Sequence, residues 1–208
     1  MLDNLVFFLE IIGTVAFAAS GAMIAVDRKM DVFGVAMLGL FTAVGGGVIR
    51  DLLLGNTPPL SFRHPVYALT AIGVSILMFT HPLRSRYNRH QRVFDLVLLV
   101  MDSVGLGIFS VMGVQVALSV DSNLYTAVFV GLVTGVGGGI LRDAMTGQPP
   151  MVFVKHFYAS ASLIGALLCA LLWPHIGEAA AMITGAITVI VLRLLAARYH
   201  WNLPMVKP

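Results

Sequence analysis

Long apolar runs separated by short polar segments make up most of the chain, and they restrict the possible folds more than any other feature. Apolar residues are 58% and charged residues 11% of the 208 residues, whereas about 25% of a soluble domain is charged. The mean hydropathy is +0.91, which leaves too few polar side chains to cover a soluble surface. This composition excludes a soluble enzyme, a disordered chain and a disulfide scaffold, and it predicts an integral membrane protein.

Seven of these runs are candidates for membrane-spanning helices, because a span needs about 20 mainly apolar residues. They are Leu5–Val26, Val32–Leu54, Pro65–Thr80, Val93–Val120, Leu124–Met145, Phe157–Trp173 and Ala179–Ala197. The sequence therefore predicts an all-α membrane protein with seven transmembrane helices.

The positions of the basic residues predict the orientation of these spans. Seven spans put the termini on opposite sides, and most of the 13 Lys and Arg then share one face. These residues are Arg28, Lys29, Arg84, Arg86, Arg89, Arg92, Lys155, Arg193, Arg198 and Lys207. The positive-inside rule makes that face cytoplasmic, so we expect the N-terminus outside and the C-terminus in the cytoplasm. Basic loops at this face would contact anionic lipid headgroups, and we expect no nucleic-acid partner.

An internal repeat appears when the chain is shifted by 92 residues. The shift aligns Gly45, Gly46, Gly47, Arg50, Asp51, Gly55, Pro58 and His64 with Gly137, Gly138, Gly139, Arg142, Asp143, Gly147, Pro150 and His156. Chance pairing of glycines does not explain so long a shared motif. Each copy holds three spans, an odd number, so the second copy would enter the membrane from the opposite side. Inverted repeats of this kind are typical of transport proteins, whose pathway lies between the two copies.

The repeat predicts how the chain is divided. We expect residues 1–83 to form the first three-helix repeat and residues 84–92 to form a basic cytoplasmic linker. Residues 93–176 would be the second, inverted repeat. Residues 177–208, which hold the seventh helix and the tail, have no counterpart in the first copy.

The two glycine triplets, Gly45–Gly47 and Gly137–Gly139, need a physical reason, because each glycine costs about 1 kcal/mol relative to alanine inside a helix. One interpretation is that the second and fifth spans bend or unwind there, so that exposed backbone groups line a polar path. The other is close helix packing, since small residues let two backbones approach. We expect the first, because one or two glycines would be enough for packing.

Arg50, Asp51, Arg142 and Asp143 follow the triplets by one helical turn. Ionisable residues at membrane depth usually face a cavity or a partner. Adjacent helical positions diverge by about 100°, so the sequence predicts pairing across the repeats, Arg50 with Asp143 and Arg142 with Asp51. The alternative is that the arginines snorkel to the interface and the aspartates cap loop amides.

Glu10 and Asp102 form a third equivalent pair. Each precedes a glycine and begins a stripe of acid, Gly, Phe and Gly along one helix face. An acid on such a face could draw cations into a pathway, or it could accept a hydrogen bond from a neighbouring helix.

Motifs of catalysis are missing from the sequence. It contains no Gly-x-Ser-x-Gly, no P-loop and no His-Glu-x-x-His, and its His, Asp and Glu residues do not have metal-ligand spacing. We therefore expect no enzyme activity, no metal site and no cofactor.

Two copies of Gly-Gly-Gly-x-x-Arg-Asp-x-x-x-Gly in a seven-span chain resemble the prokaryotic trimeric intracellular cation (TRIC) channels. The same bacterial group has been described as a glycine transporter domain. The resemblance extends over nearly the whole chain, about Leu5 to Ala197, and it implies a homotrimer in a prokaryotic inner membrane with one pore per protomer. K⁺ would be the chief permeant ion, and the glycine triplets would be hinges flanked by the Arg-Asp pairs.

The residues themselves leave the transported species open. A secondary transporter of glycine or another small amino acid is the alternative, with Arg50 or Arg142 binding the carboxylate and an acid binding the ammonium group. The sequence has no Thr-Val-Gly-Tyr-Gly filter, so strong selection of K⁺ over Na⁺ is not expected.

Overall fold

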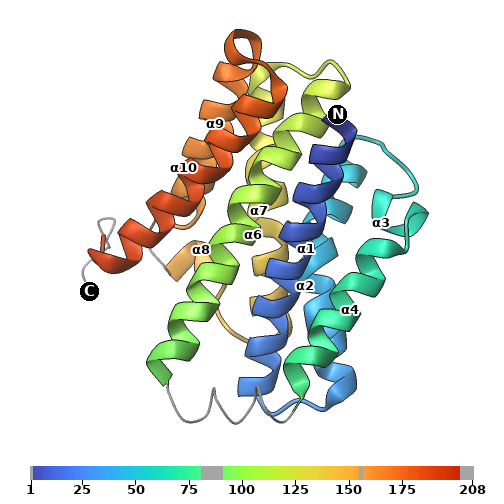
Figure 1. The fold of residues 1–208 in the computed structure, drawn as a ribbon, viewed down its shortest axis with the longest axis vertical. Coiled ribbons are helices and arrows are strands. Elements are labelled where there is room, and N and C mark those ends of the chain that lie inside the picture. The colour runs from blue at the N-terminus through green and yellow to red at the C-terminus, as the bar shows by residue number, and fades with distance from the viewer. Residues whose placement is uncertain (1, 81–90, 155–156, 202–208) are drawn as a thin grey trace.

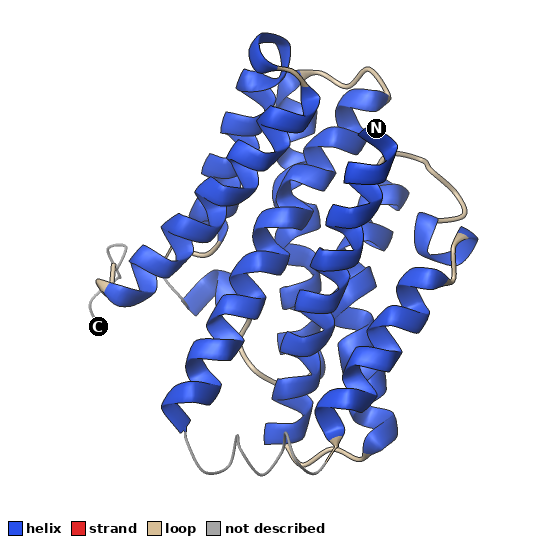
Figure 2. Cartoon of the chain, in the orientation of Figure 1, coloured by secondary structure: helices blue, strands red, loops and turns tan. Residues whose placement is uncertain are grey.

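The computed structural model describes residues 2–80, 91–154 and 157–201, and all regular structure in these ranges is helical (Figure 2). The helices are α1 (Leu2–Asp27), α2 (Val32–Leu53), α3 (Leu60–Arg63), α4 (Val66–Phe79), α6 (Gln91–Ser119), α7 (Leu124–Met145), α8 (Met151–Val154), α9 (Ala159–Ile176) and α10 (Glu178–Arg198). Most of the linker expected at residues 84–92 lies outside the described residues, as do Lys155, His156 and Lys207.

Six of the described helices are long and apolar enough to cross a membrane: α1, α2, α6, α7, α9 and α10. They coincide with six of the seven expected spans. The third span, expected at Pro65–Thr80, forms the shorter helix α4, whose 14 residues are about 21 Å long. The short helix α3 precedes α4, and α8 precedes α9 in the same way. Neither short helix was predicted from the sequence.

Four helices form the centre of the molecule. α1 and α6 lie side by side and run in opposite directions, with α2 and α7 beside them (Figure 1). α4 packs on α1 and α2, while α9 packs on α6 and α7. The added helix α10 packs on α9 and α6, so it covers the second half of the chain and not the first.

Equivalent residues of the two halves meet where α1 crosses α6. A Cβ atom on Gly13 would lie 3.2 Å from the Phe109 ring, and one on Gly105 would overlap the Phe17 ring. The two phenylalanine rings lie 5.3 Å apart between their centroids. In a membrane, close packing of this kind holds helices together, because lipid tails are as apolar as the side chains.

α2 and α7 approach even more closely. A Cβ atom on Gly46 would collide with the backbone carbonyl oxygen of Thr134, and one on Gly138 would collide with that of Thr42. Both helices continue as α-helix through their glycine triplets. The expected unwinding is therefore wrong, and close backbone packing is the physical reason for Gly46 and Gly138.

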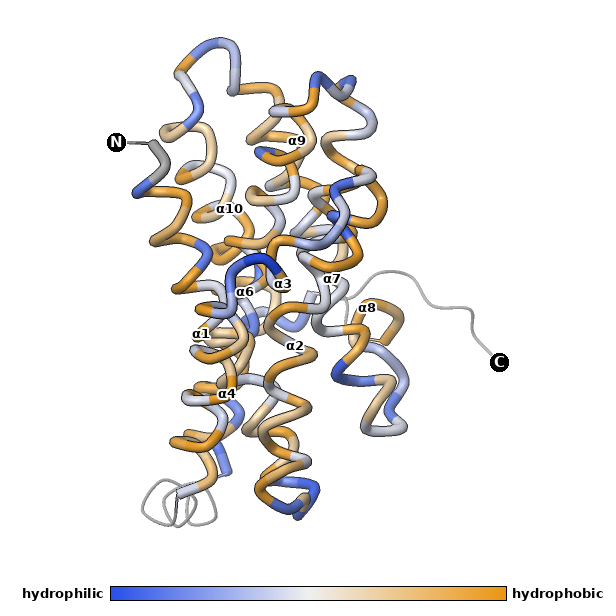
Figure 3. Tube along the Cα trace, turned by 90° about the vertical axis from the view of Figure 1, so that its right-hand side faces the viewer, coloured by the Kyte–Doolittle hydropathy of each residue, from blue (hydrophilic) through white to orange (hydrophobic). Residues whose placement is uncertain are grey.

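Apolar side chains cover the outside of the bundle as well as its core. Phe8 is 65% exposed and Phe33 is 70% exposed, and hydrophobic residues run along most of the helices, with many hydrophilic ones near their ends and turns (Figure 3). Exposed apolar surface on this scale requires lipid around it. Polar caps mark the helix ends: Asp31 accepts a hydrogen bond from the Gly34 amide at 2.7 Å, and the repeat-equivalent Asn123 accepts one from the Thr126 amide at 2.9 Å.

Candidate functional site

The arginine and aspartate of each motif pair with each other. Arg50 Nε donates to Asp51 Oδ1 at 2.8 Å, and Arg142 Nε donates to Asp143 Oδ1 at 2.9 Å. The predicted pairing across the repeats is therefore wrong. The 100° divergence of adjacent positions describes Cβ directions, but the long arginine side chain folds back far enough to reach its neighbour.

The second oxygen of each aspartate fixes the loop that follows. Asp51 Oδ2 accepts from the backbone amide of Leu60 at 2.8 Å, and Asp143 Oδ2 accepts from that of Met151 at 2.7 Å. Leu60 and Met151 are the first residues of α3 and α8, whose free amides need acceptors. The expected capping of loop amides is thus observed, whereas the arginines are buried and do not snorkel to the interface.

Arg142 is the centre of a buried charge cluster in the second half of the chain. Its Nη1 donates to Asp102 Oδ1 and to Ser20 Oγ, each at 2.6 Å. Its Nη2 lies 3.5 Å from Met151 Sδ, and the side chain is 0% exposed. These contacts join α7 to α6, α1 and α8, so one guanidinium connects both halves of the molecule.

Asp102 has two further partners that were not predicted from the sequence. The Tyr158 hydroxyl lies 3.4 Å from Asp102 Oδ1, and Arg193 Nη2 lies 3.8 Å from Asp102 Oδ2. Arg193 was placed among the basic residues of the cytoplasmic face, yet only 4% of it is exposed. Its position on an apolar helix face was the available signal, because Val189, four residues earlier, and Ala196, three residues later, are buried too.

Glu10 is the corresponding acid of the first half. It is 7% exposed and accepts a hydrogen bond from the Tyr67 hydroxyl of α4. Glu10 and Asp102 thus both bond to neighbouring helices, which was one of the two interpretations of these acids. The hydroxyls of Tyr67 and Tyr158 each contact the acid of their own half of the chain. Because the two tyrosines are 91 residues apart, the 92-residue alignment did not reveal them as a pair.

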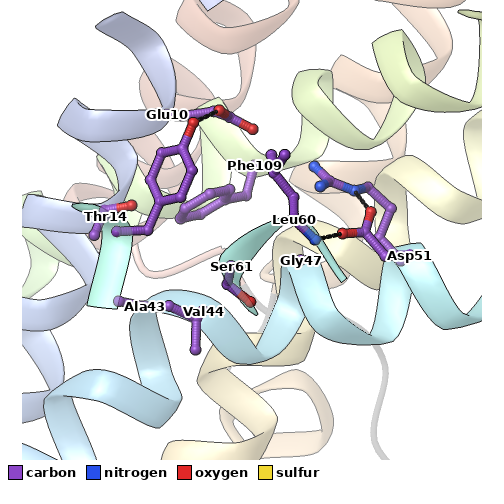
Figure 4. A pocket seen from close by; sticks show the side chains of 11 residues that line it. Glu10, Thr14, Ala43, Val44, Gly47, Asp51, Leu60, Ser61 and Phe109 are labelled. Carbon is purple, nitrogen blue, oxygen red and sulfur yellow. Dashed lines mark hydrogen bonds and ion pairs between the residues drawn. The ribbon is translucent and has the colours of Figure 1, made fainter. Parts of the chain in front are cut away.

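A cavity with a volume of about 30 Å³ adjoins Glu10, Arg50 and Asp51, which form the first charge cluster. Its lining includes Glu10, Gly47, Arg50, Asp51, Tyr67 and, from the other half of the chain, Phe109. Figure 4 shows Glu10 and Asp51 on two sides of this space. The volume has room for about two water molecules.

The cavity has the chemistry of a small cation site, but the positive charge of Arg50 opposes cation binding there. Its charged lining residues are two carboxylates and one guanidinium, so their formal charge sums to one negative. A monovalent cation or the ammonium group of a small zwitterion would be attracted there. Arg50 would oppose a cation but would attract a carboxylate, and its pairing with Asp51 reduces both effects.

Fold and site together define a multi-pass helical membrane protein built on a duplicated unit, with buried charge clusters beside the contact between its halves. A sequence profile of the family described as Glycine transporter matches residues 7–82 and again residues 99–174. The second match begins 92 residues after the first, which confirms the internal repeat. The chain belongs to this family, and the UPF0126 inner membrane protein YadS of Escherichia coli K12 is 37% identical over 96% of this chain and 95% of its own length.

Solved structures show the same fold. A prokaryotic TRIC channel in 0.5 M KCl is 30% identical and superposes with a TM-score of 0.88, covering 98% of this chain and 100% of that one. The TRIC trimeric intracellular cation channel orthologue from Rhodobacter sphaeroides is 31% identical, with a TM-score of 0.86 over 94% and 98% of the two chains. The chain is therefore a homologue of prokaryotic TRIC cation channels, as the paired motifs predicted, and TRIC channels are not enzymes.

Proposed function

We propose that this protein is a channel for monovalent cations, chiefly K⁺, with a pore in each protomer between two inverted three-helix repeats. The cavity beside Glu10 is the observation that carries the proposal. It combines carboxylates from the first repeat with a ring from the second, as expected of a pathway between repeats. The similarity to prokaryotic TRIC channels supports the same function.

The architecture proposed for the pore follows the duplicated sequence. Residues 1–83 and 93–176 are the two repeats, residues 84–92 link them, and residues 177–208 add the seventh helix. The opposite directions of α1 and α6 (Figure 1) support an inverted relationship. α4 would complete the count of seven transmembrane helices.

The glycine triplets are proposed as the flexible points of the pore. Gly47 lines the cavity, and a Cβ atom there would meet only Arg50 Nη2 at 3.9 Å, whereas one at Gly45 would collide with the side chain of Leu141 of α7. We propose that α2 bends at Gly47, while Gly45 and Gly46 lie against α7. Gly137, Gly138 and Gly139 would have the same part in α7, and the adjoining Arg-Asp pairs, with Glu10 and Asp102, would line or gate the path.

Assembly and location are proposed from the relatives. The Rhodobacter sphaeroides orthologue is a trimeric channel and the Escherichia coli relative is an inner membrane protein. We expect a homotrimer in the cytoplasmic membrane with the N-terminus outside. Arg28, Lys29 and Arg92 are exposed at helix ends, which suits contact with anionic headgroups on the cytoplasmic side.

A transporter of glycine or another small amino acid is the second candidate. The observation in its favour is that Arg50 and Glu10 line one cavity, because a zwitterion needs a cationic and an anionic partner. The family description as glycine transporter agrees with this reading.

Recordings from purified protein in planar bilayers under a KCl gradient separate the two functions. We expect discrete current steps that reverse towards the K⁺ equilibrium potential. Labelled glycine should not accumulate in proteoliposomes made from the same preparation. Uptake of glycine without current would establish the transporter and overturn the channel.

The role of the cavity has its own test. Glu10→Gln removes the net negative charge of the cavity, and we expect the K⁺ conductance to fall about three- to tenfold. This fall corresponds to roughly 1 kcal/mol of lost attraction between the cavity and the cation. Tyr67→Phe is the matched control, because it removes the hydrogen bond of Glu10 but keeps the charge. Equal conductance in E10Q and the unmodified protein would remove the cavity from the pathway.

A further inference from the structure

Arg193 distinguishes the second charge cluster from the first. The other charged members have repeat-equivalent counterparts, since Asp102, Arg142 and Asp143 correspond to Glu10, Arg50 and Asp51. Arg193 comes from α10 (Glu178–Arg198), which lies outside both regions matched by the family profile. The repeat therefore supplies no arginine of this kind to the first cluster.

The contacts of Arg193 are electrostatic and not tightly hydrogen-bonded. Its Nη2 is 3.8 Å from Asp102 Oδ2, and its guanidinium carbon lies 4.6 Å from the centre of the Tyr158 ring. Within the part of the chain that the structure describes, Arg193 Nε and Asp102 Oδ2 are buried without a hydrogen-bond partner. A guanidinium against a carboxylate and an aromatic face still gains electrostatic energy, because charges interact strongly where water is excluded.

Arg193 also changes the charge balance between the clusters. The charged residues lining the first cavity are Glu10, Arg50 and Asp51, which leaves one net negative charge. In the second cluster, the charges of Asp102 and Asp143 are matched by those of Arg142 and Arg193, which leaves none. Without Arg193 the two clusters would carry equal charge.

We propose that Arg193 determines which of the two clusters serves the permeant cation. By neutralising Asp102 it makes the second cluster unattractive to cations, so the negative charge beside the conduction path is that of the Glu10 cavity. Arg193 is thus a positioning residue for conduction, supplied by α10, which lies outside both matched regions. This inference rests on the proposed channel function.

The test uses charge arithmetic in the full-length protein in planar bilayers under a KCl gradient. Arg193→Gln leaves the second cluster with one net negative charge, so we expect the K⁺ conductance to rise about two- to fivefold. The reversal potential should move towards the K⁺ equilibrium potential. Asp102→Asn leaves a net positive charge and should shift both quantities in the opposite direction.

Three further variants make the result decisive. The double variant R193Q/D102N restores neutrality, so its conductance and reversal potential should lie between those of the two single variants. Arg193→Lys keeps the charge and should differ from the unmodified protein less than R193Q does. Arg198→Gln, at an exposed position of the same helix, removes one positive charge away from the cluster and should leave conductance and reversal potential unchanged.

The outcomes separate this inference from the proposed function. An unmodified protein that passes no current overturns both. Conduction in the unmodified protein with the same conductance and reversal potential in R193Q overturns the inference alone, as do shifts of R193Q and D102N in the same direction. If R193Q does not fold, D102N is compared with the double variant, which has no unmatched charge. The double variant must then conduct more than D102N.

Discussion

The backbone contact between α2 and α7 makes a sharp prediction about two neighbouring glycines. Gly46 lies against the carbonyl oxygen of Thr134, and a methyl group at Gly46 would overlap that oxygen. At Gly47, the nearest atom to an added methyl group would be Arg50 Nη2 at 3.9 Å, which is an ordinary contact. Gly46→Ala and Gly47→Ala therefore add the same group to the same helix with opposite consequences.

The magnitudes follow from the geometry. Relief of the overlap at Gly46 requires the two helices to separate by about 1 Å, and a gap of 0.5–1 Å forfeits about a quarter to a half of each dispersion contact along the crossing. We expect G46A to lower the free energy of unfolding by about 1–3 kcal/mol, the usual cost of overpacking. G47A should raise it by up to about 1 kcal/mol through better helix propensity. The difference between the variants is then about 1–4 kcal/mol.

Cys169 can serve as the reporter of unfolding in this measurement. Cys169 is the single cysteine and is 0% exposed, so a thiol-reactive fluorogenic dye reacts when the detergent-solubilised protein unfolds. A protein of this size changes its melting temperature by about 2–4 °C per kcal/mol, so G46A should melt at least about 2 °C below G47A. Equal melting temperatures would refute the packing argument, and a less stable G47A would reverse it.

Two further results are expected. Asp143→Ala and Asp51→Ala should each lower the free energy of unfolding by about 3–5 kcal/mol, because each leaves a buried arginine without its adjacent carboxylate. The same dye measures the change. Wild-type stability in both variants would show that the Arg-Asp pairs contribute nothing to stability. A maleimide should leave Cys169 unmodified in native membranes and modify it after denaturation, as mass spectrometry would show, whereas rapid labelling of the folded protein would contradict the observed packing of α9.

The sequence was sufficient to predict the long helices and the repeat, but not the short helices α3 and α8. The span expected at Leu124–Met145 coincides with α7, because polar residues interrupt the apolar run at both ends. The repeat could be recognised in the sequence because equivalent residues of α2 and α7 make equivalent contacts with each other. Gly46 faces the backbone of Thr134 and Gly138 faces that of Thr42, so both copies must keep the same small residue.

The partners of the buried charges could not be predicted in the same way. Spacing along a helix gives the direction of a Cβ atom, but the reach of Arg50 and Arg142 depends on rotamers and on the space around them. Arg193 was assigned to the headgroups because hydropathy counts a basic residue near a helix end as interfacial. Only the three-dimensional packing of α10 on α6 shows that its counter-charge, Asp102, lies beside it.

Duplication of the chain would by itself give two equivalent charge clusters, and we propose that Arg193 makes them different. Two identical halves related by a two-fold axis produce two identical charge clusters, and a cation between them would have two equivalent places to stay. Ser20 and Arg193 both act on the second cluster alone: Ser20 hydrogen-bonds Arg142, and Arg193 lies against Asp102. The position equivalent to Ser20 is Met112, which cannot donate or accept a comparable hydrogen bond. The asymmetry therefore arises from one substitution inside the repeat and one helix outside it. A cation would therefore be attracted to the net negative charge of Glu10, Arg50 and Asp51.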